Sequence, residues 1–334
     1  MEAQPLTVLV VGATGTIGRL VVAEATARGH TVRALVRDRT KGAQLLPADA
    51  ELVVGDVTRP ETLPEAVAGD AIVLTLGSFG TGASSPQTVD YAGVRNVLTA
   101  LASLDGARPR VALMTSIGAT TRSSSYGHPL EWKRRSERLV RASGLTYTIV
   151  RPGWFDMNGP DEHQMVFLQG DRRRSGGPAD GCVARADIAR VPVAALTAPE
   201  AVGCTFELVA EQGAAPSDLR PLFAALDQDP PGSLDVVRDE ANMPLDAESG
   251  APRSLEPPAA CLVRRRGRCA ARTRSRGKRI ASSFGYFLPS GRWSAASERK
   301  PDLLAWGFVS AHYVRCGRYG RYFDAGMTLV LMGC

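Results

Sequence analysis

The first 250 residues contain little cysteine. Six cysteines occur in the chain, but only Cys182 and Cys204 fall in this part, and no two of the six form a CxxC pair. This pattern argues against a disulfide framework in that region and favours a reducing compartment. We also find no grouping of His, Cys and Asp at metal-ligand spacing, and no nucleophile elbow.

Long hydrophobic runs are absent as well. No apolar run reaches the roughly 18 residues that a membrane-spanning helix needs. The N-terminus lacks the basic segment followed by an apolar segment that marks a secretory signal. We therefore expect a cytoplasmic protein with no membrane partner.

Positive charge is scarce in the first 250 residues and abundant after them. From residue 251 on there are 16 Lys and Arg against 4 Asp and Glu, whereas the first 250 residues carry 24 and 30. Residues 248–260 are rich in Pro and Gly, and 263–279 are rich in Arg with few apolar residues. We expect 248–334 to be a linker and a poorly ordered basic tail without a confident domain.

Two alternatives remain open for the tail. Clustered arginines can neutralise nucleic-acid phosphates, but no recognisable docking motif accompanies these, so nucleic acid is not the expected partner. The abrupt change in composition is also typical of a shifted reading frame.

Short apolar runs alternate with amphipathic segments as far as residue 245. Strands are expected at 6–11, 31–36, 51–54, 71–76, 110–116, 146–150 and 205–209, and helices at 17–29, 86–104, 130–143, 187–197 and 217–227. Continuous β-branched runs separated by helices indicate a parallel sheet that is covered on both faces. The expected fold is α/β, a doubly wound parallel-sheet Rossmann domain over 1–247. Segments of about 151–185 and 205–245 would form a small substrate-covering part.

A glycine motif between the first strand and the first helix carries the strongest functional signal. In "VVGATGTIG" (10–18), Gly12 allows the tight turn, Gly15 lets the backbone approach a pyrophosphate, and Gly18 permits close helix packing. Thr14, Thr16 and Ile17 complete the loop. The helix N-terminus offers free N–H groups to phosphates. We predict a dinucleotide site there.

The ends of the next strands select the dinucleotide. An acidic residue after the second strand would favour NAD, but Arg37 comes first, and a guanidinium can clamp a 2′-phosphate. Although Asp38 follows, Arg39 and Lys41 add positive charge, so we predict NADP rather than NAD. The alternative is a solvated basic turn.

Two further strand ends contribute to the predicted site. Asp56 and Val57 are expected beside the adenine ring, and Leu76 and Gly77 at the same sheet edge. Thr58 and Glu61 also have the spacing of a helix capping box.

The chain from about 6 to 245 resembles the atypical short-chain dehydrogenase/reductases, which are related to epimerase/dehydratase enzymes and NmrA-like proteins. The matching segments are "GATGTIG", "RALVRD", "GDVTRPETL", "VDYAGVRNVL", "MTSIGA", "KRRSERLVRASGLTYTIVRPGW" and "ARADIARV". The resemblance implies catalysis by Asn, Ser, Tyr and Lys.

Carried over position by position, the resemblance gives an incomplete catalytic set. Lys133 matches the lysine, Ser116 the serine (strict register would place it at Ile117), and Asp90 stands at the asparagine position. The tyrosine position is Pro129, which has no transferable proton.

Three residues could replace the tyrosine: Tyr126, His128 or Asp156. Each also has an ordinary explanation, as a loop aromatic, a residue before a helix or a turn residue. Lys133 could instead bind the nicotinamide ribose, or belong to a charged helix face whose arginines need only solvent. We interpret Asp187 as a helix N-cap.

Two functions follow from these assignments. The first is an NADP-dependent oxidoreductase that acts on a small carbonyl or related substrate, with a pocket shaped by "RPGWFD" and "MVFLQGD". The second is a catalytically silent NADP(H)-sensing protein of the NmrA-like kind, which the missing tyrosine favours.

Overall fold

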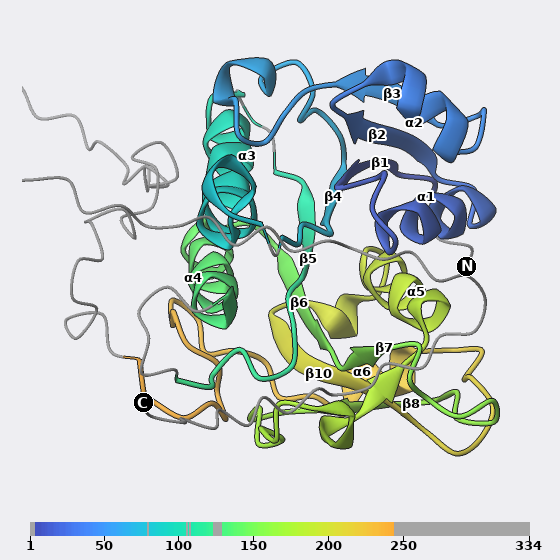
Figure 1. The fold of residues 1–334 in the computed structure, drawn as a ribbon, viewed down its shortest axis with the longest axis vertical. Helices are drawn as coiled ribbons and strands as arrows, with labels where there is room; N and C mark the ends of the chain where they lie inside the picture. Colours follow the sequence, from blue (N-terminus) through green and yellow to red (C-terminus); the bar gives the residue numbers. More distant parts are fainter. Residues whose placement is uncertain (1–3, 79, 105, 107, 123–128, 244–334) are drawn as a thin grey trace, which may run out of the picture. The chain divides into compact units, whose positions relative to one another are not determined.

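The computed structural model describes residues 4–78, 80–104, 106, 108–122 and 129–243 (Figure 1). Tyr126, His128 and the basic tail therefore lie outside the described residues. Within the described part, no helix is long and apolar enough to cross a membrane.

The centre of the fold is a sheet of ten strands. They are β1 (Thr7–Val11), β2 (Thr31–Val36), β3 (Glu51–Val54), β4 (Ala71–Leu74), β5 (Arg110–Met114), β6 (Tyr147–Pro152), β7 (Trp154–Phe155), β8 (Gln164–Leu168), β9 (Cys182–Val183) and β10 (Cys204–Glu211). The strand order is β3-β2-β1-β4-β5-β6-β10-β9-β7, and β8 pairs with β10. From β3 to β10 all neighbours are parallel. The predicted doubly wound α/β fold is confirmed.

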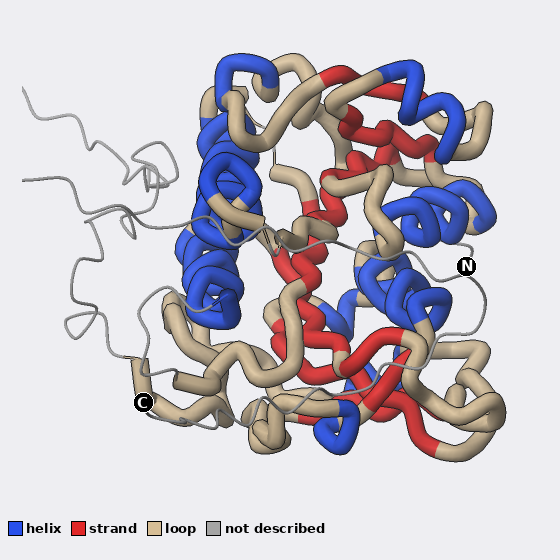
Figure 2. Tube along the Cα trace, viewed as in Figure 1, coloured by secondary structure: helices blue, strands red, loops and turns tan. Residues whose placement is uncertain are grey.

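Helices cover both faces of this sheet (Figures 1 and 2). They are α1 (Gly18–Ala27), α2 (Arg39–Leu45), α3 (Ala92–Ala102), α4 (Pro129–Ala142), α5 (Arg185–Ala195) and α6 (Arg220–Ala224). In Figure 1, α1 and α5 lie on one side of the central strands, and α3 and α4 on the other.

Alternation along β1 shows how the sequence divides the core between these faces. Val8 and Val10 belong to the hydrophobic cluster that contains the buried residues of α1 and α5. Leu9 and Val11 belong to the cluster formed with α3 and α4. Successive strand residues point to opposite faces, so an uninterrupted apolar run fills two cores at once.

The order of the strands separates two loops at the carboxyl edge of the sheet. After β1 the chain runs outward through β2 and β3, then returns to β4 on the other side of β1. The loops after β1 and β4 consequently diverge, which is where open α/β sheets bind ligands.

Two elements differ from the expected pattern. The helix expected at 86–104 begins with a π-helical turn, Gln87–Tyr91, before α3. Strand β8, in the segment expected to shape a substrate pocket, pairs antiparallel with β10, so the sheet is not entirely parallel. A π turn inserts an extra residue and rotates the side chains that follow it. Here the turn contains Asp90.

Candidate cofactor cleft and active site

The glycine loop is held in one tight conformation. Gly12 has φ +86°, and a Cβ on it would lie 2.9 Å from Thr75 Oγ1. The Gly15 amide donates to the Gly12 carbonyl oxygen at 2.9 Å. A Cβ on Gly18 would overlap that same carbonyl oxygen. The loop can therefore turn directly from β1 into α1 only with glycine at these positions.

A cleft of about 960 Å³ opens beside this loop. Eight of the residues predicted to contact the cofactor line it: Gly12, Thr14, Gly15, Arg37, Asp56, Val57, Leu76 and Gly77. Ile17 and Gly18 are instead buried, and Thr16 lines a neighbouring pocket. The fold thus brings the ends of β1, β2 and β4 and the loop after β3 to one hollow of ligand size.

The two residues after β2 have different environments. Asp38 caps α2, because its carboxylate accepts the Lys41 amide at 3.1 Å. Arg37 lines the cleft, is exposed, and has no hydrogen-bond or ion-pair partner among the described residues. Arg39 donates to the Leu52 carbonyl at 2.9 Å. The guanidinium that faces the cleft is therefore free to bind an anion.

The predicted capping box between Thr58 and Glu61 is wrong. The short 3₁₀ turn Pro60–Thr62 has no side-chain cap. Both the Thr58 amide and the Thr58 hydroxyl donate to Asp56 Oδ1, at 2.9 and 2.8 Å. These bonds hold the Asp56 carboxylate at the rim of the cleft.

Lys133 forms a buried ion pair with Asp90. Lys133 Nζ lies 3.0 Å from Asp90 Oδ2, and the two side chains are 11% and 3% exposed. Ser136, one turn further along α4, donates to the Asp90 carbonyl at 2.7 Å. Burial raises the pKa of Asp90 above its ordinary value, although the Lys133 ammonium opposes this shift. Lys133, at the lysine position of the catalytic set, and Asp90, at the asparagine position, are therefore in direct contact.

The serine position lies at the end of β5. Ser116 is half-buried, and its hydroxyl donates to the Ile117 carbonyl at 3.1 Å. The hydroxyl of the neighbouring residue, Thr115, is already used in a hydrogen bond that it donates to Glu137 at 2.7 Å. Pro129, at the tyrosine position, is the first residue of α4.

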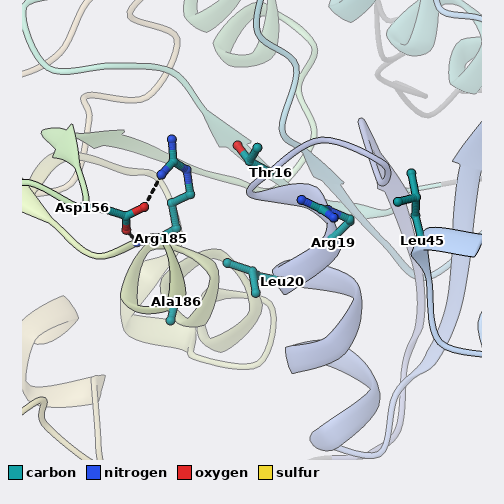
Figure 3. Close-up of a pocket in the computed structure, with 7 residues that line it drawn as sticks. All are labelled: Thr16, Arg19, Leu20, Leu45, Asp156, Arg185 and Ala186. Carbon is teal, nitrogen blue, oxygen red and sulfur yellow. Dashed lines mark hydrogen bonds and ion pairs between the residues drawn. The ribbon is translucent and has the colours of Figure 1, made fainter. Parts of the chain in front are cut away.

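Both carboxylate oxygens of Asp156 already have hydrogen-bond partners. Its Oδ1 accepts the Arg185 amide at 2.8 Å, and its Oδ2 pairs with the Arg185 guanidinium (Figure 3). Both oxygens of this side chain are thus used to hold Arg185, which leaves neither oriented toward a substrate as a proton donor.

Asp187 does not cap α5 as predicted. The helix begins earlier, at Arg185, whose amide is already bonded to Asp156. Asp187 is the third residue of the helix, is 5% exposed, and contacts His163 Nδ1 at 2.8 Å. The helix therefore begins two residues earlier than predicted, because its first amide finds an acceptor, Asp156, in a distant loop.

The expectation that the arginines of α4 need only solvent is wrong. Four of these arginines are buried: Arg134, Arg135, Arg138 and Arg141. Residues 227–243, which we call the acidic strap, supply carboxylates to three of them. Arg134 and Arg138 pair with Asp235, and Arg141 pairs with Asp229.

Arg151 of β6 is the centre of this arginine–carboxylate network. It is fully buried and bonds to Glu137 at 2.7 Å, Asp239 at 2.7 Å and Glu207 at 3.2 Å. Burial opposes ionisation of Glu137, but Arg151 and Arg141 outweigh it and lower its pKa to about 2. For Glu207 burial dominates and raises the pKa to about 7.

Comparison with known proteins supports the dinucleotide-binding fold that the glycine loop and the strand order indicate. A family model described as NAD(P)H-binding matches residues 12–199. The chain belongs to this NAD(P)H-binding family. The resemblance to the atypical short-chain dehydrogenase/reductases is thereby confirmed.

The relatives of this chain have names that refer to different functions. An NAD(P)H azoreductase from Xenophilus azovorans is 28% identical over 252 residues, covering 74% of this chain and 83% of the relative. The uncharacterized sugar epimerase YhfK of Bacillus subtilis is 32% identical over 209 residues, covering 60% and 92%. A solved Bacillus halodurans structure, named for NAD-dependent epimerase/dehydratase activity, has a TM-score of 0.54 and 25% identity, covering 66% of this chain and 99% of that one.

The cleft beside the glycine loop also has lining residues that the sequence prediction missed. They are Leu35, Gly55, Thr58, Arg59, Pro60, Thr75, Ser78, Ala83, Ser84, Thr88, Val89, Ala92, Arg95 and Asn96. Thr75 could have been found, since it precedes Leu76 at the same strand end. Val89, Ala92 and Asn96 share one helical face at spacings of three and four residues. Among the described residues, no group of three or more His, Cys, Asp or Glu could hold a metal ion.

Proposed function

We propose that the chain binds NADP(H) in preference to NAD(H) and transfers hydride from NADPH to a small acceptor. One observation carries the cofactor choice. Arg37 faces the cleft without a described partner, while the neighbouring carboxylate of Asp38 is used to cap α2. The residue that would bind a 2′-phosphate is free, and the one that would bind a ribose hydroxyl is not.

Arg37→Ala tests this choice. We expect the affinity for NADPH to fall about tenfold, because one charge-assisted contact to the 2′-phosphate is lost. The affinity for NADH, which lacks that phosphate, should stay within twofold. Calorimetric titration with both dinucleotides measures the difference, and Arg220→Ala is the matched control on an exposed arginine paired with Asp218. Equal affinities of the wild-type chain for NADPH and NADH would contradict the proposal.

The tyrosine acid of the related enzymes is missing from its usual position, and Tyr126 and His128, two candidates for its role, lie outside the described residues. Pro129 replaces that tyrosine, and Asp156 is paired with Arg185. When bound, NADPH would supply a hydride to the acceptor and leave as NADP⁺, and the accompanying proton would come from solvent. A carbonyl or azo compound whose reduced form takes a proton readily from water fits this arrangement. The azoreductase relative supports the azo class.

The Lys133–Asp90 pair favours a second candidate, an NADP(H)-sensing protein of the NmrA-like kind. Neither residue lines the cleft, but Asp90 directly follows Val89, which does, so the ion pair can hold this wall of the cleft in shape without any proton transfer. The two functions differ in one measurable property, since only the enzyme oxidises NADPH when an acceptor is present.

A paired substitution separates them. Lys133→Met alone would leave Asp90 buried and unpaired, so we propose Asp90→Leu with Lys133→Met, which replaces both charges by apolar groups. Loss of NADPH absorbance is followed with a panel of carbonyl, quinone and azo acceptors. We expect wild-type turnover that falls at least tenfold in the double variant. If the wild-type chain binds NADPH but oxidises none across the panel, the sensor is the better assignment.

A further inference from the structure

A second pocket adjoins the glycine loop. It has a volume of about 710 Å³ and is lined by Thr16, Arg19, Leu20, Leu45, Asp156, Arg185 and Ala186 (Figure 3). Thr16 follows Gly15, which lines the cofactor cleft, so the two hollows meet at the loop. This volume lies within the range of small-molecule sites.

Two arginines from different helices enter this pocket. In Figure 3 the side chains of Arg19, on α1, and Arg185, on α5, approach it from opposite sides, with Thr16 between them in that view. Arg19 is exposed, and its side chain has no ion-pair partner in the part of the chain that the structure describes. Two guanidinium groups against one carboxylate leave the pocket with an excess of positive charge.

Arg185 is held in place from two sides. Asp156 contacts both its amide and its guanidinium, and the guanidinium lies 5.2 Å from the centre of the Phe155 ring. Asp156 itself adopts a left-handed backbone with φ 55°, a conformation that is uncommon for a non-glycine residue. The surrounding structure thus maintains a strained residue whose side chain fixes the position of a guanidinium at the pocket.

The remaining wall of the pocket is apolar. Leu20 and Leu45 are 36% and 44% exposed, and Ala186 completes the apolar part of the lining. A ligand that combined an oxyanion with an apolar or planar body would satisfy the arginines and cover the leucines together.

We propose that this pocket is an anion-binding site for a phosphate or carboxylate attached to an apolar body. Arg19 and Arg185 would bind the oxyanion, and Asp156 is a positioning residue that orients Arg185. The proposal rests on the proposed function in one respect. The oxyanion belongs either to the nicotinamide half of the dinucleotide or to an acidic acceptor.

Binding of half-ligands to the full chain tests the site and distinguishes these two sources. The probe 2′,5′-ADP reports on the cofactor cleft, and nicotinamide mononucleotide reports on the nicotinamide half. Methyl red, which carries a carboxylate, is compared with its uncharged parent 4-(dimethylamino)azobenzene on protein saturated with NADP⁺. Each is titrated into the wild-type chain, Arg19→Ala, Arg185→Ala and the control Arg220→Ala.

We expect each pocket variant to weaken one oxyanion probe about tenfold, the effect of one charge-assisted hydrogen bond. Binding of 2′,5′-ADP and of the uncharged dye should not change, and Arg220→Ala should affect no probe. A selective loss of nicotinamide mononucleotide identifies the cofactor as the source. A selective loss of methyl red identifies the acceptor.

The proposal is overturned if neither oxyanion probe binds the wild-type chain, or if both bind the two arginine variants as they bind wild type. Failure of 2′,5′-ADP to bind the wild-type chain would instead count against the proposed function, and the other probes would still test the pocket. Asp156→Asn gives a second check, because asparagine tolerates the left-handed backbone and keeps an acceptor for the Arg185 amide. Replacing the oxygen that pairs with the Arg185 guanidinium should weaken binding of the oxyanion probe about threefold, and unchanged or stronger binding would contradict the role given to Asp156.

Discussion

Arg151→Met is expected to lower the free energy of unfolding by about 3–5 kcal/mol. The substitution removes a fully buried guanidinium from between Glu137, Glu207 and Asp239 and replaces it with a side chain that cannot pair with them. Although Glu137 keeps Arg141 and Thr115 as partners, the remaining carboxylates lose their main counter-charge while staying out of water.

Urea unfolding at neutral pH measures this effect. Arg220→Met removes an arginine that also pairs with an aspartate, but its side chain is 67% exposed, so its cost should stay below about 0.5 kcal/mol. A change of less than about 1 kcal/mol for Arg151→Met would mean that the network contributes little to stability.

Gly18→Ala is expected to weaken NADPH binding by about 10- to 100-fold and to lower the free energy of unfolding by about 1–3 kcal/mol. The added methyl group would overlap the Gly12 carbonyl oxygen, so the loop or the first turn of α1 must move. The amides that would face a pyrophosphate would move with it.

Gly177→Ala provides the control, since nothing lies within 4 Å of a Cβ at that position and its backbone is extended, with φ −148°. Fluorescence titration with NADPH and urea unfolding should show no change for this control. Wild-type affinity in Gly18→Ala would show that the close approach at Gly12 is not needed for binding.

The parts of the fold that depend on local sequence could be predicted. The segment TVRALV at 31–36 is β2 to the residue, because a short run rich in β-branched and aliphatic residues is enough to indicate a strand. The glycine motif predicted the loop after β1, since Gly15 and Gly18 both lie against the Gly12 carbonyl oxygen within the same loop.

The parts that depend on distant segments could not. The helix at 129–142 has the composition of a solvated surface, and nothing within it shows that Asp229 and Asp235 cover its arginines. The start of α5 was misplaced because its acceptor, Asp156, comes from a loop 29 residues earlier. Burial of a charged residue is a tertiary property, so a local pattern cannot report it.

The same distinction between local and distant interactions applies to the candidate site. Arg37 and Asp38 are adjacent in the sequence, yet only the structure shows which one caps a helix and which one faces the cleft. Asp90 and Lys133 were each suggested by resemblance, but only the structure shows that the π turn before α3 brings Asp90 into contact with Lys133 of α4.

The acidic strap also determines how short a self-sufficient version of this chain can be. The last strand of the sheet ends at Glu211, and a truncation there would keep every strand. It would nevertheless remove Asp229, Asp235 and Asp239 and leave the arginines of α4 and β6 buried without these partners. The minimal folding unit therefore extends beyond the sheet, through the strap at 227–243.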